Sequence, residues 1–215
     1  LRRQGSQTKI KLNHQLEWLD GSLEDKWVKQ LSECDMFVHL AAHSTNVPYD
    51  TLENCIYWNV IVSLKLLNQA VDAGIKNFII AGTGFEYGIS GEKYDFVPVN
   101  APLKPTMSYP ASKAASSIIF HQWAIENQVY LKYLRIFQVF GEGENENRLW
   151  PSLKKAAQAG EDFHLTSGKQ IRNFVHVSEV AKQFIDNLVF SDVKSGKPVI
   201  KNIGTNKHQS IKAFA

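Results

Sequence analysis

Tyr109 and Lys113 are the residues whose types and spacing point most directly to chemistry. They stand four positions apart in the run Tyr-Pro-Ala-Ser-Lys, and on a helix that spacing places both side chains on one face. A phenol is a poor acid–base group at neutral pH, because its ordinary pKa is about 10. A neighbouring ammonium stabilises the phenolate and lowers that pKa. The pair therefore predicts a proton donor and acceptor beside a carbonyl group.

Thr83 adds a third candidate group. Tyr-x-x-x-Lys alone recurs by chance in many proteins, so its surroundings decide its weight. The apolar run 78–82 leads into Gly-Thr-Gly-Phe-Glu-Tyr-Gly at 82–88. A hydroxyl at the carboxyl end of a buried strand, between glycines that leave room for a ligand, can bond the substrate oxygen that Tyr109 protonates. The other interpretation is a turn in which Thr83 bonds its own backbone.

These residues must be positioned by the elements around them, and apolar runs alternate there with helix-like segments. Strands alternating with helices predict an α/β fold, a doubly wound parallel sheet with helices on both faces. Ligands of such sheets bind at the carboxyl ends of the strands, here the loops after Ala41, Gly82 and Ile136. The predicted strands are Met36–Ala42, Phe78–Gly82 and Tyr130–Ile136, and the predicted helices are about Leu23–Leu31, Leu52–Ala73 and Ser108–Asn127.

The pattern changes after residue 140. Gly, Glu and Asn crowd residues 141–147, and short helices then alternate with short strand-like pieces. The sequence therefore predicts a larger α/β domain over 1–140 and a smaller mixed lobe over 141–215. The elements expected in this lobe are helices near Trp150–Ala159 and Val177–Phe190, and strands near Phe163, Phe174 and Val199.

Composition and charge argue against several other classes of protein. The 215 residues are 44% hydrophobic and 21% charged, with a net charge of +3, which is typical of a soluble globular protein. Scattered basic residues give no support to nucleic-acid binding. No apolar run approaches the roughly 20 residues of a membrane span, and we expect a cytoplasmic protein. Cys34 and Cys55 lack CxxC spacing, and His39 lies in a predicted strand four residues before His43, so no zinc or other metal site is predicted.

Several segments, in the same order, resemble the extended short-chain dehydrogenase/reductase family of the NAD-dependent epimerase/dehydratase type. This family includes nucleotide-sugar epimerases, dehydratases and 4-ketoreductases. The matches cover nearly all of the chain. They imply a Rossmann-type NAD(P)-binding domain in 1–140 and a partial substrate-binding lobe in 141–215. The segments that carry the resemblance are His39–Ala42, Asn59–Ser63, Thr83–Gly88, Tyr109–Lys113, Arg135–Gly141, Arg172–Val177 and Asn202–Gly204.

The resemblance also implies roles for individual residues. Thr83 would be the catalytic hydroxyl, Tyr109 the acid/base and Lys113 the anchor of the nicotinamide ribose. The residues implied in cofactor binding are Arg2, Arg3, Ser22, Leu23, Leu40, Ala41, Ala42, Asn59, Tyr109 and Lys113. Those implied in substrate binding are His43, Thr83, Gly84, Phe85, Gln138, Arg148 and Arg172, of which Arg172 would grip the diphosphate of a nucleotide sugar.

Two departures from the family pattern concern the cofactor. The glycine-rich phosphate-binding turn after the first strand is missing. We therefore expect a chain cut at both ends, with the first βαβ part absent, that binds cofactor weakly and is inactive alone. Arg2 and Arg3 would then follow the second strand, where arginines can neutralise the 2′-phosphate of NADP, and NADP is favoured over NAD. Ser22 replaces an aspartate that contacts adenine in the family.

A further departure concerns the reaction. Gly84 and Phe85 stand where the family's dehydratases carry an Asp-Glu pair, which argues against 4,6-dehydratase chemistry. The favoured function is a 4-keto-6-deoxysugar reductase acting on a nucleotide-diphosphate sugar. One alternative is a nucleotide-sugar 4-epimerase with tightly held NAD. Another is a non-catalytic dinucleotide-binding sensor or scaffold. The helices Leu52–Ala73 and Ser108–Asn127 are candidates for a homodimer interface.

Overall fold

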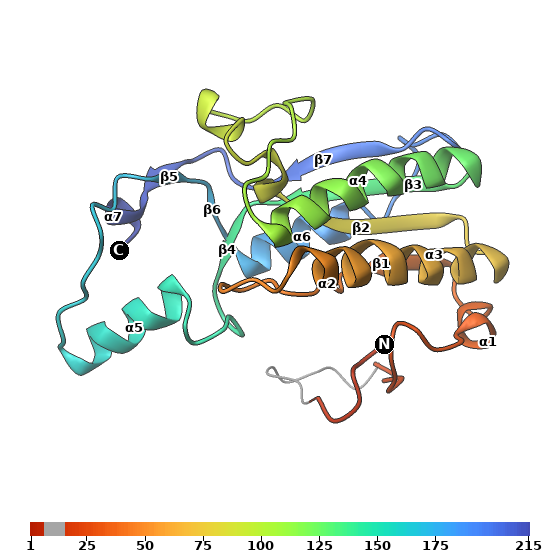
Figure 1. Cartoon of the computed structure of the whole chain (residues 1–215), viewed down its shortest axis with the longest axis horizontal. Helices are drawn as coiled ribbons and strands as arrows, with labels where there is room; N and C mark the ends of the chain where they lie inside the picture. Colours follow the sequence, from red (N-terminus) through yellow and green to blue (C-terminus); the bar gives the residue numbers. More distant parts are fainter. Residues whose placement is uncertain (7–15) are drawn as a thin grey trace.

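A four-stranded parallel sheet forms the centre of the computed structural model, which describes residues 1–6 and 16–215 (Figure 1). Its strand order is β1-β2-β3-β7, so each strand is hydrogen-bonded in parallel to the next. The predicted doubly wound α/β fold is confirmed. The four strands are β1 (Met36–His39), β2 (Asn77–Thr83), β3 (Tyr130–Ile136) and β7 (Val199–Ile203).

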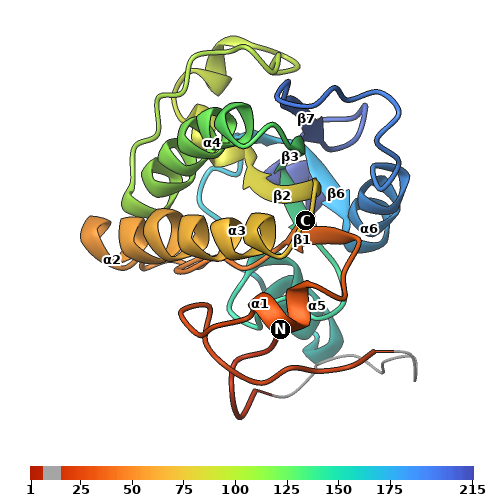
Figure 2. The same ribbon diagram turned by 90° about the vertical axis from the view of Figure 1, so that its right-hand side faces the viewer.

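Helices cover both faces of this sheet because apolar side chains point from both sides of its central strands. On one face, Phe78 and Tyr133 pack with residues of α3 (Ser63–Asp72) and α4 (Ser108–Glu126). On the other face, Ile79 and Leu134 pack with α6 (Val177–Asp186). Figure 2 shows α3 and α4 on one side of the strands and α6 on the other. Side chains of a parallel strand buried on both faces read as a continuous apolar run, which is why β2 was predictable.

The predicted long helix Leu52–Ala73 is present but is not uniform. It consists of α2 (Leu52–Ile56), a π-helical turn over Tyr57–Val62, and α3. The Thr51 hydroxyl caps its start by accepting the Asn54 N–H at 3.2 Å. Gly74 ends it with a φ of +96°, as expected for a helix-terminating glycine. A π turn inserts an extra residue into the helix and is common at functional sites.

Some predicted elements are shorter than expected or absent. The helix expected over Leu23–Leu31 is only α1 (Val28–Leu31), because the Asp25 carboxylate accepts the Ser22 N–H at 2.7 Å and holds a turn before it. Residues 161–170 contain no strand, so the strand expected near Phe163 is wrong. The strand expected to reach Ala42 ends at His39 and the helix expected to reach Phe190 ends at Asp186.

The chain after residue 140 supplies the predicted smaller, mixed elements. Most of them lie beyond the carboxyl ends of the sheet strands (Figure 1), although β7 and α6 belong with the sheet. The division of the chain at residue 140 therefore stays a prediction. The smaller elements are β4 (Gln138–Phe140) paired with β6 (Phe174–His176), β5 (Ile171–Arg172) paired with β8 (Gln209–Ser210), α5 (Leu149–Ala159) and α7 (Ile211–Phe214).

Within 1–6 and 16–215, no helix is long and apolar enough to cross a bilayer. In the same part of the chain, no three His, Cys, Asp or Glu side chains gather as a metal site would need. Cys34 is exposed and Cys55 is buried, and both carry free thiols.

A charged cluster fastens β3 to β7 from the face opposite α4. The Lys132 side chain is only 2% exposed, and its Nζ lies 2.7 Å from Asp192 Oδ1. Lys201 of β7 contacts the other oxygen of Asp192 at 3.0 Å. Hydrogen bonds from Lys132 and Lys201 hold the pKa of Asp192 below its ordinary value of 3.8. Asp192 is thus the partner that allows the Lys132 ammonium to be buried.

We predict that Asp192→Asn lowers the melting temperature at pH 7, because it removes the carboxylate partner of a buried ammonium. A lowered folded-state pKa gives stability that is present above the unfolded pKa and is lost as the pH falls through the folded value. The melting temperatures of wild type and variant, measured by circular dichroism, should therefore converge at acid pH. Asp186→Asn, which breaks the exposed Lys182–Asp186 pair, is the control and should change little at either pH. Equal effects of the two substitutions would contradict this role of Asp192.

Candidate active site

Thr83, Tyr109 and Lys113 come from two elements that pack against each other at the carboxyl end of the sheet. Thr83 is the last residue of β2, and Tyr109 and Lys113 lie in the first two turns of α4. All three are buried, with exposures of 7%, 8% and 3%. The Lys113 Nζ donates to the carbonyl oxygen of Ala81 at 2.9 Å, two residues before Thr83. The predicted spacing thus brings the phenol and ammonium of α4 to the end of the strand that carries the hydroxyl.

The Thr83 hydroxyl takes part in a turn, as the second interpretation of the sequence proposed. Its Oγ1 accepts the Phe85 N–H at 3.3 Å at the start of a 3₁₀ turn over Gly84–Tyr87. A hydroxyl that accepts a hydrogen bond still has its own hydrogen to donate. The turn therefore orients Thr83 and leaves it a donor, so both interpretations of this residue are compatible.

Burial dominates the protonation of Tyr109. It raises the pKa of the phenol well above its ordinary value of 10, and repulsion from an ionised Tyr49 and from the Glu86 carboxylate raises it further, whereas Arg148 lowers it. Burial also lowers the pKa of Lys113, against the opposing effect of Glu86. The expected lowering of the pKa of Tyr109 is wrong for this structure, because desolvation of the phenolate raises it instead. Tyr109 is a neutral phenol at neutral pH, able to donate its proton.

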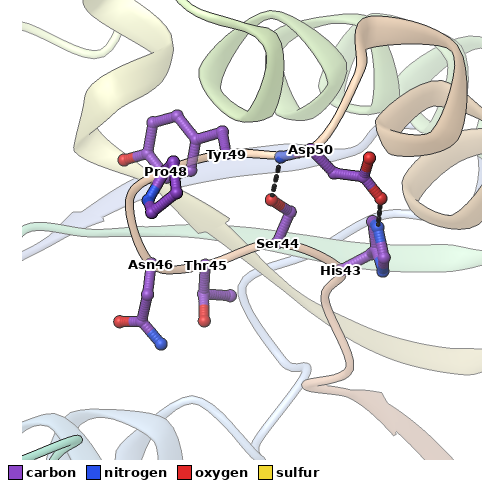
Figure 3. Close-up of a pocket in the computed structure, with 7 residues that line it drawn as sticks. All are labelled: His43, Ser44, Thr45, Asn46, Pro48, Tyr49 and Asp50. Atoms are coloured by element: carbon purple, nitrogen blue, oxygen red, sulfur yellow. Dashed lines mark hydrogen bonds and ion pairs between the residues drawn. The ribbon is translucent and has the colours of Figure 1, made fainter.

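A loop after β1 forms an open pocket of about 490 Å³ beside these residues (Figure 3). The centre of the Tyr49 ring lies 5.4 Å from the centre of the Tyr109 ring. This contact joins the pocket to α4. Asp50 organises the loop, since its carboxylate lies 2.7 Å from His43 Nε2 and its N–H donates to Ser44 Oγ at 2.7 Å. The pocket is lined by His43, Ser44, Thr45, Asn46, Pro48, Tyr49 and Asp50.

Asn59 fixes this pocket loop to α4. Its Oδ1 accepts the His43 N–H at 2.7 Å, and its Nδ2 donates to the His43 carbonyl at 3.2 Å and to Ser112 Oγ at 2.9 Å. Ser112 in turn donates to the carbonyl of Tyr109 at 2.8 Å. Asn59 lies in the π turn and is buried. Its observed contacts anchor the loop, and its predicted part in cofactor binding stays a prediction.

The other predicted cofactor residues come from the loop after β1 and from the start of the chain. Leu40, Ala41 and Ala42 directly follow β1 and are exposed, so a ligand can approach their backbone. Arg2 already has a carboxylate partner, with Nε and Nη2 at 2.6 and 2.9 Å from the two oxygens of Asp20. Arg3 is exposed. The roles of these residues in cofactor binding stay predictions.

Ser22 and Leu23 occupy the turn before α1. The Ser22 hydroxyl accepts the Glu24 N–H at 3.2 Å, and its carbonyl accepts the indole N–H of Trp27 at 2.8 Å. Leu23 packs against the core cluster of the α3–α4 face. These contacts explain the local turn. The predicted adenine-binding role of this segment stays a prediction.

Three of the predicted substrate residues, Gly84, Phe85 and Arg148, lie outside the pocket loop. Gly84 follows Thr83, and a Cβ there would lie 3.0 Å from the Phe137 ring, so a small residue suits this close approach. Phe85 is 39% exposed at the same turn. Arg148 lies 3.1 Å from Glu144 and is near enough to lower the pKa of both Tyr49 and Tyr109. Among the predicted substrate residues, Arg148 lies outside α4 and still acts electrostatically on Tyr109.

Gln138 and Arg172 lie in the smaller elements after β3. The Gln138 backbone N–H donates to the carbonyl of Asn173, which ties β4 to the segment that follows β5. Arg172 is exposed in β5, and its Nη1 donates to the carbonyl of Ile171 at 2.8 Å. Their proposed contacts with a sugar nucleotide stay predictions.

Two charged residues near Thr83 were not among the predicted site residues. Glu86 lies in the 3₁₀ turn that follows Thr83 and is completely buried. Its carboxylate is 2.7 Å from the Nε of Arg135, which is buried in β3. An arginine in a strand predicted to be buried was the available signal, since a buried guanidinium needs a carboxylate partner.

Comparison with known proteins identifies the family of the chain. The profile of the NAD dependent epimerase/dehydratase family matches residues 1–204. A UDP-glucose 4-epimerase of Corynebacterium glutamicum is 28% identical over 215 residues, covering 90% of this chain and 63% of the relative. A dTDP-D-glucose 4,6-dehydratase of Homo sapiens is 28% identical over 207 residues, covering 93% of this chain and 57% of the relative.

Solved structures share the fold. The UDP-glucuronic acid 4-epimerase of Bacillus cereus, in complex with UDP-glucuronic acid and NAD, superposes with a TM-score of 0.80 at 21% identity. The match covers 94% of this chain and 64% of that structure. The chain thus spans about three-fifths of the length of these relatives.

We predict that Asn59→Leu loosens the pocket loop, because it leaves the His43 backbone and Ser112 without their amide partner. The loss in free energy of unfolding should be about 1–3 kcal/mol, measured by urea denaturation. Amide hydrogen exchange over residues 43–50 should become faster. Asn68→Leu is the matched control, since Asn68 is exposed on α3 and bonds only Trp123 among the described side-chain contacts. If both variants change exchange in the loop equally, Asn59 is not its anchor.

Proposed function

Because the chain belongs to the NAD dependent epimerase/dehydratase family, we propose that its protein transfers hydride between a nicotinamide cofactor and the sugar of a nucleotide-activated sugar. The observation that carries this proposal is the placement of Thr83, Tyr109 and Lys113 at one sheet edge beside an open pocket. Both 28% identical relatives are named for glucose joined to a nucleoside diphosphate. Their names support the substrate class.

The sheet edge fits a dinucleotide in two respects. Exposed small side chains, Ala41 and Ala42, follow β1 and leave the backbone accessible. Lys113 places a buried ammonium next to β2, where it can bond ribose hydroxyls. When bound, the nicotinamide supplies or accepts the hydride. The chain itself supplies the orientation and the proton.

The proton chemistry follows from the protonation of Tyr109. In a reduction, the sugar carbonyl gains a hydride and becomes an alkoxide, and the neutral Tyr109 phenol gives its proton to that oxygen. Thr83 donates a hydrogen bond to the same oxygen and holds it in place. Burial, which keeps Tyr109 protonated, stabilises the form of the residue that this direction requires.

These features favour a 4-keto-6-deoxysugar reductase over the other reactions of the family. Gly84 and Phe85 provide no carboxylate next to Thr83, whereas dehydratases need an acid and a base there to remove water. A 4-epimerase is the second candidate, because the relative of 63% coverage is named UDP-glucose 4-epimerase. It would use Tyr109 first as base and then as acid.

The two long helices offer a surface for a second copy of the chain. Apolar side chains on α2, the π turn and α4 are exposed, and a homodimer would cover them. They are Leu52, Tyr57, Ile61, Ile118 and Ile119, with exposures of 50%, 40%, 42%, 63% and 36%.

For the cofactor we propose NADP, with Arg3 as the contact to the 2′-phosphate, since Arg2 is already paired with Asp20. We expect Arg3→Ala in the full-length protein to raise the KM for NADPH about fivefold, the size of an exposed charge contact. The KM for NADH should not change. Steady-state rates with each cofactor measure this difference, and an equal change in both KM values would rule out a phosphate contact by Arg3.

The central experiment is Tyr109→Phe in the full-length protein, supplied with NADPH and dTDP-4-keto-6-deoxyglucose. Absorbance at the nicotinamide band should show NADPH oxidation by wild type, and the variant should lose about 100- to 10,000-fold in kcat. Tyr94→Phe, at an exposed tyrosine, is the control and should match wild type. Failure of wild type to oxidise NADPH would contradict the reductase, and interconversion of UDP-glucose and UDP-galactose would then identify the epimerase. Tyr109→Phe with undiminished biological activity would favour the sensor.

A further inference from the structure

Glu86 is a fully buried carboxylate for which the proposed mechanism has no use. Its exposure is 0%. Its Oε2 accepts from Arg135 Nε at 2.7 Å, and its Oε1 accepts from the Thr83 N–H at 2.8 Å and from the Tyr133 hydroxyl at 3.0 Å. A charge removed from water is costly unless partners surround it. Glu86 therefore sits in a prepared site.

Arg135 extends this site across several elements. Its Nη1 donates to the Tyr87 hydroxyl at 2.9 Å and to the carbonyl of Val99 at 3.0 Å, while Nη2 lies 3.4 Å from Ser117 Oγ on α4. The guanidinium also lies over the Tyr87 ring, 4.8 Å from its centre. The Glu86–Arg135 pair thus connects the end of β2, strand β3 and helix α4.

Glu86 is linked to both elements that carry the catalytic residues. It bonds the Thr83 N–H directly. Through the Tyr133 hydroxyl, which lies 3.0 Å from Glu86 Oε1 and 3.2 Å from the carbonyl of Lys113, it also reaches the second turn of α4. Glu86 Oε1 therefore links Thr83 to the helical turn that contains Lys113.

Gly82 provides independent evidence that Glu86 and Tyr133 must lie close to the backbone of β2. A Cβ at residue 82 would lie 2.2 Å from a carbon of the Tyr133 ring and 2.7 Å from Glu86 Oε1. Neither distance is compatible with a side chain. The glycine before Thr83 thus lets the carboxylate and the phenol approach the strand.

We propose that the Glu86–Arg135 pair is a positioning device that holds Thr83 in register with Tyr109 and Lys113. The inference rests on the proposed hydride transfer, whereas the contacts of Glu86 and Arg135 are observed independently of it. A buried ion pair is a poor source of stability, since apolar residues of similar volume often replace one without loss. An apolar pair could not accept the Thr83 N–H or bond the Tyr133 hydroxyl. Positioning is what the charged pair supplies and an apolar pair does not.

The test compares two double variants of the full-length protein in which no buried charge is left alone. Glu86→Leu with Arg135→Met removes both charges and both hydrogen bonds to Thr83 and Tyr133. Glu86→Gln with Arg135→Gln removes the charges but keeps an acceptor at Oε1. We expect the first to lose about 100-fold in kcat, the effect of a misplaced catalytic group, with KM within about threefold and a cooperative melting transition. The second should retain kcat within about threefold.

A purely structural role gives a different pattern. It predicts that kcat follows the melting temperature in both variants, so a Leu/Met variant that melts and turns over like wild type overturns the proposal. Lys132→Met with Asp192→Leu, an ion pair on the same strand that avoids the catalytic residues, is the matched control. It should leave kcat unchanged. An equal loss of kcat in this control would also overturn the proposal.

Tyr133→Phe covers the case in which the Leu/Met variant does not fold. It removes only the hydroxyl between Glu86 and the Lys113 carbonyl, and should lower kcat about 3- to 10-fold without changing KM, as expected for loss of one hydrogen bond. Tyr130→Phe on the same strand is its control. Unaltered kcat in Tyr133→Phe would overturn the link between Glu86 and α4.

A measurement without turnover separates this inference from the proposed function. Amide hydrogen exchange at Thr83 and over residues 113–117 should quicken in Tyr133→Phe and in the Leu/Met variant, while the rest of the sheet keeps its protection. If wild type transfers no hydride, the proposed function fails, yet this local exchange pattern still supports positioning. Uniform exchange changes across the sheet would overturn it.

Discussion

The packing of α4 against β2 is the constraint on which the rest of the structure depends. At one end of the contact the rings of Phe78 and Trp123 meet edge to face, with centroids 5.0 Å apart. At the other end the Lys113 ammonium bonds the Ala81 carbonyl. Hydrophobic burial holds the helix on the sheet, and the polar contact fixes its first turns relative to Thr83. The pocket loop is added to this frame by Asn59 and Ser112.

Burial at this junction also sets the charges of the site. Burial, with a smaller effect of Lys113, lowers the pKa of His39 to about 3, so His39 is a neutral partner of Ser63 rather than a titrating group. Burial raises the pKa of Tyr109 and lowers that of Lys113. In the mechanism that we propose, Tyr109 keeps its proton until a carbonyl gains negative charge nearby. The same packing that positions the groups therefore gives them their chemistry.

Much of this frame could be predicted from the sequence, and the exceptions have physical reasons. Apolar runs predicted β2 and β3, and Tyr109 and Lys113 were found by spacing. The π turn could not be predicted, because Tyr57–Val62 keeps an ordinary helical pattern. The pairing of Arg2 with Asp20 could not be predicted either, because it joins residues 18 positions apart. The raised pKa of Tyr109 depends on desolvation, which requires the packed structure. The burial of Glu86 was not predicted, because it depends on the local 3₁₀ turn over Gly84–Tyr87.

In the proposed mechanism, Thr83 and Tyr109 serve a single substrate oxygen at the carboxyl end of β2. A crystal structure of the full-length protein with NADP and a nucleotide sugar tests it most directly. The predicted result places one sugar oxygen about 2.6–3.2 Å from both Thr83 Oγ1 and Tyr109 Oη. A sugar bound away from the Tyr49 side of the pocket, or an oxygen reached by neither hydroxyl, would contradict the account.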